Sequence, residues 1–430
     1  MFHPEILEQI KEERARDGFI YPWYGKYSIA ELAPSVQSLF GFPAPRPTFP
    51  QNFFSKLPGT YKKIILFAID GFGYSHFTKN YKNLSFFDRL QDRGEVFPIT
   101  SVFPSTTPAA LTSIYTGLTP QEHGLPEWTV YFEEFDSIVE PLLFRKHKSG
   151  DRESLVKIGG KPEVLFEGKS IFNQLAEHDI KSYYFIYQDY FPSSYSSITS
   201  AGSHVQPFCD GRDLMQKLTA AVETASEATY FFVYWSNIDS AQHAYGPQSV
   251  PHTRALGEFS DLVENEFLKK LSPAAAEDTL LLLSSDHGQT DIRGEDILYL
   301  GKYVYLNDTY SKNKSGERIL PTGSPHDVFL FIDPAKVQET IQLLQKDLQG
   351  KAEVLTTRAA LSRGLFGIGK ASQKFINRIG NILILPYPSV HIWYEYFPPE
   401  TYHQLGIHGG LSEEEMIVPF AIAELKNLVN

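Results

Sequence analysis

Three aspartates end apolar segments that the sequence pattern predicts to be buried β-strands. The segments FAID, WSNID and LLSSD end in Asp70, Asp239 and Asp286. Because a strand buried on both faces holds its last residue in place, these carboxylates are expected to be fixed and partly desolvated. Three converging carboxylates repel each other unless a cation lies among them. The alternative for each aspartate alone is that it caps the turn that follows it.

Histidines lie near two of these aspartates in the sequence, and a third histidine precedes two glycines. In NIDSAQHAYGP, Asp239 and His243 are four residues apart, so they share a face if the segment is helical. In SSDHG, His287 follows Asp286 directly, and GIHGG places His408 before two glycines. Mixed aspartate and histidine ligands suit zinc or a similar divalent ion. The sequence therefore predicts divalent-metal ligands in these segments.

An adjacent pair of hydroxyls, Thr106 and Thr107, lies in the stretch FPSTTPAALTSIYTG, at the start of a predicted helix. Pro108 suits the first helical position, which makes Thr107 the predicted N-cap. Capping alone is one interpretation of this pair. A helix N-terminus also offers unpaired N–H groups and a partial positive charge, which suit a phosphate oxygen. A threonine hydroxyl that a metal ion activates is a nucleophile, which is the other interpretation.

Strands and helices alternate along most of the chain. Apolar runs predict strands at 62–70, 96–103, 181–189, 228–239 and 278–286. Amphipathic segments predict helices at 85–94, 108–117, 170–180, 213–227 and 253–271. This alternation predicts an α/β fold, a mostly parallel sheet flanked by helices on both faces. Ligands of such sheets bind beyond the carboxyl ends of the strands, where the aspartates are expected.

Two regions depart from this alternation. Residues 1–59 are predicted to form an N-terminal extension, with a polar helix near 4–17 and a proline-rich irregular segment. Residues 60–430 are predicted to form the main domain, interrupted by a smaller α+β insertion at 292–403. The insertion is expected to act as a cap that shapes access to the strand ends.

Composition limits the classes of function. The formal net charge is −12, from 39 basic and 51 acidic residues. An acidic chain binds nucleic acid and anionic membranes poorly, although bound cations let it hold a small anion. The single cysteine, Cys209, excludes an internal disulfide and a thiolate zinc cluster. The N-terminus lacks an apolar signal core and no apolar run is long enough for a membrane span, so a soluble, cytoplasmic protein is expected.

Asp70-Gly71 together with FPSTTPAALTSIYTGLTPQEHG, NIDSAQHAYGP, SSDHG and GIHGG resembles the alkaline phosphatase superfamily. The resemblance is closer to its type I phosphodiesterase/nucleotide pyrophosphatase branch. It implies an alkaline-phosphatase-like catalytic domain with two divalent metal ions, zinc by preference and manganese as the alternative. One ion would be held by Asp239, His243 and His408. The other would be held by Asp70, Asp286 and His287, together with Thr107.

The same resemblance implies a hydrolase of phosphodiesters or nucleotide-like pyrophosphates that forms a covalent phospho-threonine intermediate. Counting back from Thr116-Gly117 assigns the family nucleophile to Thr107 and not to Thr106. The expected partner is a small phosphate-ester substrate. A phosphomonoesterase or phosphonate hydrolase with the same metals is one alternative, and a non-catalytic metal-binding module is another.

One position departs from the family pattern. Phosphodiesterases of this branch carry an asparagine four residues after the glycine of HG, and the chain has Trp128 there. An indole N–H is a single, bulky donor, which leaves the preference for diesters or monoesters open. The segment LLFRKHKSG contains three basic residues that are interpreted as a solvated basic face, with substrate binding as the alternative: Arg145, Lys146 and Lys148. His123 and His326 are predicted to have structural roles.

Overall fold

The computed structural model describes residues 1–57, 59–396 and 402–429. Its centre is a seven-stranded sheet with the order β4-β20-β11-β3-β10-β8-β9. These strands are β3 (Lys63–Ile69), β4 (Glu95–Thr100), β8 (Lys181–Tyr187), β9 (His204–Phe208), β10 (Thr229–Trp235), β11 (Thr279–Ser284) and β20 (Ile417–Glu424). β20 runs antiparallel to β4 and β11, whereas the other adjacent pairs are parallel. The predicted mostly parallel α/β sheet is confirmed.

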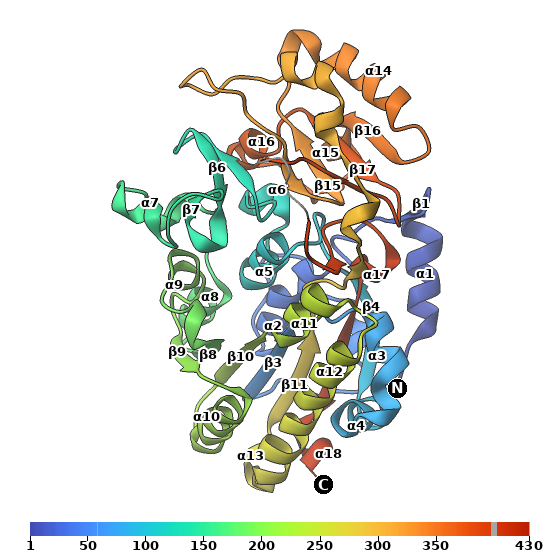
Figure 1. Ribbon diagram of the computed structural model, residues 1–430. Coiled ribbons are helices and arrows are strands. Elements are labelled where there is room, and N and C mark those ends of the chain that lie inside the picture. The colour runs from blue at the N-terminus through green and yellow to red at the C-terminus, as the bar shows by residue number, and fades with distance from the viewer. Residues whose placement is uncertain (58, 397–401, 430) are drawn as a thin grey trace.

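Helices cover both faces of this sheet (Figure 1). One layer contains α4 (Ser85–Arg93), α10 (Gly211–Thr224), α12 (Val250–Leu262) and α18 (Leu425–Val429), and the other contains α2 (Leu32–Leu39), α5 (Thr107–Thr116) and α8 (Ile171–Ala176). The ring of Phe67 on β3 meets Phe259 of α12, with centroids 5.6 Å apart. On the opposite face, Phe232 of β10 meets Tyr115 of α5 at 5.1 Å.

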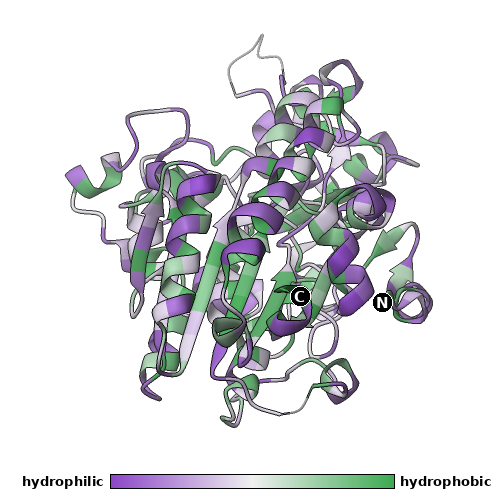
Figure 2. Cartoon of the chain, turned by 90° about the horizontal axis from the view of Figure 1, so that it is seen from below, coloured by the Kyte–Doolittle hydropathy of each residue, from purple (hydrophilic) through white to green (hydrophobic). Residues whose placement is uncertain are grey.

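Burial on both faces explains the unbroken apolar runs that the sequence shows. Every residue of β3, β10 and β11 is buried. Figure 2 shows these strands as largely hydrophobic between helices with hydrophilic outer faces. Since parallel strands end at the same edge of a sheet, Asp70 after β3 and Asp286 after β11 come together there.

The position of Asp239 differs from the prediction. Strand β10 ends at Trp235, and Asp239 lies in the first turn of α11 (Asn237–Tyr245) instead of at a strand end. The helix satisfies the four-residue spacing between Asp239 and His243, which places both on one face. The predicted long helix is also divided, since α12 is followed by a π-helical turn at Val263–Phe267.

A second, antiparallel sheet lies within the segment predicted as an insertion. Its strands are β14 (Thr322–Ser324), β15 (Asp327–Leu330), β17 (Ile382–Pro386) and β16 (Ala352–Thr356), in that order, and α14 (Val337–Asp347) packs on it. It has a hydrophobic cluster of its own around Leu330, Leu344 and Ile384. β13 (Ile297–Tyr299) and β18 (His391–Trp393) pair separately. Residues 397–401 of the predicted insertion lie outside the described residues, and its limits stay a prediction.

The N-terminal residues cover the edge of the main sheet. Helix α1 (Pro4–Arg14) is shorter than predicted and is followed by a hairpin of β1 (Ala15–Arg16) and β2 (Phe19–Ile20). Backbone bonds join Val96 N–H to Met1 O at 2.8 Å and Thr100 N–H to Tyr27 O at 2.7 Å, along the free side of β4. A covered edge strand is protected from pairing with other chains.

A further three-stranded sheet, β5 (Val130–Phe132), β6 (Ser137–Glu140) and β7 (Arg145–Lys146), follows the site loop of Trp128. None of the helices in the described parts of the chain combines the length and the apolar character needed to span a membrane.

Arg378 joins the second sheet region to the main domain. It ends α16 (Gln373–Arg378), is 2% exposed, and donates to the carbonyl oxygens of Gly124, Val164 and Leu165 at 2.6–2.7 Å. Burial lowers the pKa of Arg378 to about 10. Its guanidinium also lies 3.8 Å from the ring centroid of Phe132.

We expect Arg378→Met to lower the free energy of unfolding by about 3 kcal/mol or more, because three buried carbonyls lose a charged donor. Urea denaturation measures the change. The control Arg363→Met removes a guanidinium that is 40% exposed and pairs with Glu353 at 2.6 Å; it should cost less than about 1 kcal/mol. Equal effects of the two substitutions would show that Arg378 does not fasten this region.

Candidate functional site

The two threonine hydroxyls at the start of α5 face different partners. The N-cap is Thr106, with φ −118° and ψ 150°, so the prediction of Thr107 as the cap was wrong by one residue. Extended backbone at Thr106 lets its carbonyl accept the first helical bond, from Ala110 N–H at 2.8 Å. The Thr106 hydroxyl lies 3.4 Å from Pro126 O, whereas the Thr107 hydroxyl lies 3.1 Å from His287 Nε2. Only Thr107 therefore faces the predicted ligands.

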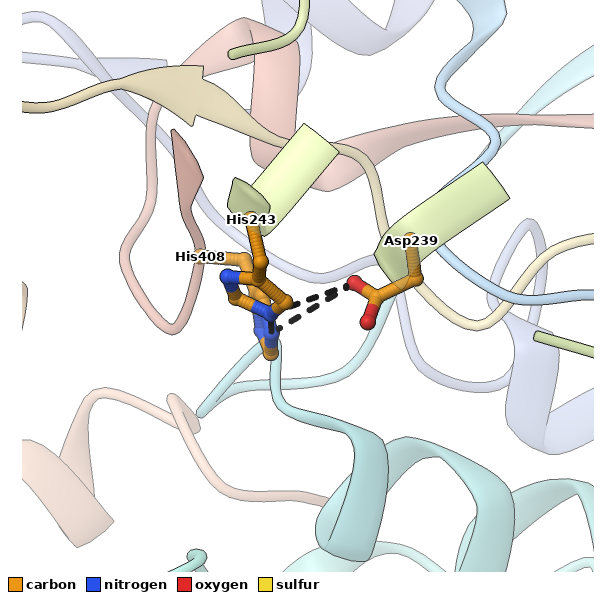
Figure 3. Close-up of side chains that lie close together, drawn as sticks. All are labelled: Asp239, His243 and His408. Carbon is orange, nitrogen blue, oxygen red and sulfur yellow. Dashed lines mark hydrogen bonds and ion pairs between the residues drawn. The ribbon is translucent and has the colours of Figure 1, made fainter. Parts of the chain in front are cut away.

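Asp239, His243 and His408 form a first cluster (Figure 3). One potential ligand atom from each lies within 4.8 Å of the others. Asp239 Oδ1 is 3.4 Å from His243 Nε2 and 3.9 Å from His408 Nε2. The amide of Gln289 donates to the same Oδ1 atom. The two imidazoles approach each other with their Nε2 atoms 3.2 Å apart.

Asp70, Asp286 and His287 form a second, fully buried cluster with the same 4.8 Å limit. His287 Nε2 is 3.4 Å from both Asp70 Oδ1 and Asp286 Oδ2. Neither of these oxygens has a hydrogen-bond partner, although both are buried. The other oxygens are bonded, Asp70 Oδ2 by Tyr234 and Asp286 Oδ1 by the N–H groups of Gly71 and His287. Two orphaned carboxylate oxygens and an imidazole nitrogen therefore face one point.

The clusters adjoin each other. The rings of His287 and His408 stack with centroids 3.7 Å apart and planes 13° apart. Gly71 lies beneath Asp239 in a left-handed conformation, with φ 72°, and a Cβ atom there would approach Asp239 Cα to 3.0 Å. Glycine is thus required for β3 and α11 to bring their aspartates so close.

Backbone carbonyls orient all three imidazoles. His243 Nδ1 lies 2.8 Å from Gly406 O, His408 Nδ1 3.0 Å from Ser105 O, and His287 Nδ1 3.1 Å from Gly288 O. Because a carbonyl oxygen only accepts, each Nδ1 donates to its carbonyl, and each ring turns its Nε2 atom into the site. Such partners fix histidines that ligate metals.

The electrostatics of the clusters fit divalent cations. Burial and the neighbouring rings of His287 and His243 hold the pKa of His408 well below its usual range. The Nε2 atoms of His243 and His408 are 3.2 Å apart while both Nδ1 atoms face carbonyl oxygens, so one cation could accept both Nε2 atoms. Burial, and then the carboxylates of Asp286 and Asp239, raise the pKa of Asp70 well above its usual range. Aspartate oxygen and histidine nitrogen donors suit zinc.

The loop of His408 is held by residues that the sequence reasoning did not assign. Glu415 is 1% exposed and accepts from Gly410 N–H at 2.8 Å and from the Ser412 hydroxyl at 2.6 Å. His326 Nδ1 lies 2.7 Å from Glu415, and His326 Nε2 lies 2.8 Å from His391 Nδ1. Burial raises the pKa of Glu415, but His326 and the hydrogen bonds from Ser412 and Gly410 together outweigh this, and the net pKa is lowered.

A sequence signal for this capping interaction was available. Ser412 and Glu415 form a capping box, which the S-x-x-E spacing indicates. The partnership with His326, 89 residues away, had no such signal. The structural role predicted for His326 agrees with these contacts, as does that of His123, which is buried and accepts from Leu125 N–H at 3.1 Å.

Two cavities meet at Thr107. The larger, about 460 Å³, is lined by Asp239, His243 and His408 and by residues of the 292–403 segment. The smaller, about 220 Å³, is lined by Asp70, Asp239 and several tyrosines. Trp128 is 42% exposed and lines both. Of the basic residues beside it, Arg145 pairs with Glu140 at 2.6 Å, whereas Lys148 lines the larger cavity.

Comparison with known proteins identifies the family of the chain. The model of the family "Type I phosphodiesterase / nucleotide pyrophosphatase" matches residues 64–411, so the chain belongs to this family. It is a hydrolase of the phosphodiesterase/nucleotide pyrophosphatase type, in the alkaline phosphatase superfamily. No curated protein sequence gave a significant match.

Solved structures show the same fold. Murine ectonucleotide pyrophosphatase/phosphodiesterase 5 (ENPP5, NPP5) is 18% identical, with a TM-score of 0.59, and the match covers 84% of this chain and 87% of that chain. An inactive variant of the same murine protein, in complex with AMP, matches with a TM-score of 0.61 at the same identity and coverage.

Asp70→Asn should separate stability from cation binding. The raised pKa of Asp70 means that the folded, metal-free protein keeps a proton that the unfolded chain releases above about pH 4. The stability contributed by this group therefore falls as pH rises, and the metal-free variant should be more stable than wild type at pH 8.

Added zinc should make wild type more stable than Asp70→Asn. At a zinc concentration of 100 times the dissociation constant, each intact site contributes about 2.7 kcal/mol, so the variant, which keeps the cluster of Asp239, His243 and His408, should gain about that much less than wild type. Denaturation at pH 5 and pH 8, with chelator and with zinc, measures both effects. The control Asp261→Asn changes an exposed carboxylate and should alter neither. Equal stabilisation of Asp70→Asn and wild type by zinc would contradict a ligand role for Asp70.

Proposed function

We propose that the chain hydrolyses phosphodiesters or nucleotide-like pyrophosphates through a covalent phospho-threonine intermediate at Thr107. The observation that carries this proposal is the 3.1 Å distance from the Thr107 hydroxyl to His287 Nε2, where the two ligand clusters adjoin. In this proposal Asp239, His243 and His408 hold one divalent ion. Asp70, Asp286, His287 and Thr107 hold the other. Zinc suits these ligands best, and manganese is the alternative.

Two divalent ions, when bound, supply charge that activates the attacking hydroxyl and stabilises the entering and leaving oxygens. Thr107 Oγ forms the new bond to phosphorus as its proton passes to solvent water. The bond from phosphorus to the leaving oxygen breaks, and that oxygen keeps the electron pair. Free N–H groups and the dipole of α5 orient a non-bridging oxygen. Water then attacks phosphorus in the second step, which restores Thr107 and releases the phosphorylated product.

A nucleotide-like substrate is favoured by the family and by the complex of a murine ENPP5 variant with AMP. Trp128 lines the site at the position where phosphodiesterases of this branch are expected to carry asparagine. A phosphomonoesterase or phosphonate hydrolase is therefore the second candidate. A non-catalytic metal-binding module is disfavoured, because such a protein has no need for a buried hydroxyl beside a complete ligand set.

Removal of metal should abolish turnover, and zinc or manganese should restore it. The chelated and reconstituted protein is assayed with p-nitrophenyl phosphate, bis-p-nitrophenyl phosphate and the p-nitrophenyl ester of thymidine 5′-phosphate. We expect the two diesters to be preferred, since two substituents fill the two cavities. A strong monoester preference would support the second candidate, and absence of metal-dependent turnover would support a binding module.

Separate substitution of the two threonines tests the nucleophile. Thr107→Ala should reduce kcat by about 10³-fold or more and should lose the phosphoryl adduct that intact-mass measurement detects after an acid quench. Thr106→Ala is the matched control and should keep most of the turnover and the adduct, since its hydroxyl faces Pro126 O. If Thr106→Ala loses the adduct and Thr107→Ala keeps it, the nucleophile is Thr106 and its assignment to Thr107 is wrong.

A further inference from the structure

The larger cavity lies on the side of the site from which a leaving group departs. This step rests on the proposed function. The Thr107 hydroxyl is 3.1 Å from His287, so attack comes from the cluster of Asp70, Asp286 and His287. In an in-line displacement the leaving oxygen departs on the opposite side of phosphorus. That direction leads to Asp239, His243 and His408, all of which line the 460 Å³ cavity.

Aromatic side chains from two parts of the chain line this cavity. Trp128 is one, and its 42% exposure is high for a tryptophan beside a buried site. Tyr299 of β13 and Trp393 of β18 also line it. These two residues are direct partners in the parallel pairing of the strands, so their rings share one face of a small sheet. Trp393 also packs edge-on against Tyr396, with centroids 5.9 Å apart, which supports the Trp393 ring.

Polar side chains also line this cavity. Lys148 lines the cavity, with its Nζ atom 5.7 Å from the ring centroid of Tyr396. His147 lines it too, and its Nδ1 atom is bonded to Glu140 at 2.9 Å. Glu395 and Ser324 add further polar lining. A long acyl chain would place apolar atoms against these polar groups, whereas a planar ring with polar edges suits both the aromatic and the polar lining.

We propose that this cavity is a leaving-group subsite that accepts a planar aromatic ring, an aryl group or a nucleobase, between Trp128 and Trp393. Rings of this kind stack on aromatic side chains and tolerate a cation such as Lys148 at their edge. The retained group of the substrate then lies toward the 220 Å³ cavity on the other side of Thr107. Selectivity for the leaving group is thereby separated from selectivity for the retained group.

Two esters that differ only in the leaving group test this subsite. Both keep thymidine 5′-phosphate as the retained group. One carries phenol and the other a fluorinated aliphatic alcohol of similar acidity, so that leaving-group chemistry is matched. We expect metal-loaded wild type to show the higher kcat/KM for the phenyl ester. Trp393→Leu and Trp128→Leu should each lower kcat/KM for the phenyl ester by about fivefold or more, with a much smaller change for the alkyl ester.

Further variants distinguish loss of the subsite from a folding defect. Trp128→Phe keeps a stacking ring and should retain the phenyl preference. Tyr303→Leu is the matched control, since Tyr303 lies in the same segment but lines neither cavity; it should leave both rates unchanged. Equal losses for the two esters in both tryptophan variants would overturn the subsite, as would a preference for a long-chain alkyl ester. No turnover of either ester by metal-loaded wild type would overturn the proposed function, and the subsite with it.

Discussion

The convergence of three carboxylates at one edge of the central sheet is the constraint on which the rest of the structure depends. Asp70 and Asp286 are buried with one unpartnered oxygen each, and Asp239 adds a third charge nearby. A folded chain tolerates such a cluster only if a cation or a proton compensates it. The sheet forces the convergence, because parallel neighbours β3 and β11 must end side by side. Fold stability and cation binding are therefore coupled through the same three side chains.

Backbone groups position the imidazole and carboxylate atoms of the site. Three carbonyl oxygens accept hydrogen bonds from the Nδ1 atoms of His243, His287 and His408, so the Nε2 atoms face inward before any ligand arrives. Gly71 lets the end of β3 approach α11. Preorganisation of this kind reduces the reorganisation that binding requires, at the cost of repulsion in the metal-free state.

The segment at 292–403 takes part in the site in two ways. Through His326 it contacts Glu415, which in turn holds Gly410, two residues after His408. Through Tyr299 and Trp393 it builds a wall of the larger cavity. The same segment thus supports the loop of His408 through Glu415 and also lines the larger cavity. Exchange of its lining residues is a route by which substrate choice could change without disturbance of the cation ligands.

Sequence reasoning and structure agree where short-range patterns decide the outcome. The apolar runs at β3, β8, β10 and β11 predicted strands because each is largely buried. The mostly parallel sheet followed from their alternation with helices. The predicted ends of the strands and helices were less accurate. β10 ends four residues before Asp239, and the N-cap of α5 is Thr106. Helix ends depend on local backbone geometry, which composition specifies only to within a few residues.

The sequence by itself determined the types of the ligands, their local spacings and the family, because these depend on side-chain chemistry and on neighbours within a few residues. Only the tertiary structure decided that the Thr107 hydroxyl faces His287 while that of Thr106 turns to Pro126. It alone decided that His326 meets Glu415 and that Tyr299 of β13 pairs with Trp393 of β18. Apart from the contact of Thr106 with Pro126, these contacts join residues about 90 or more positions apart, and no local pattern specifies which distant strands and loops will pack together.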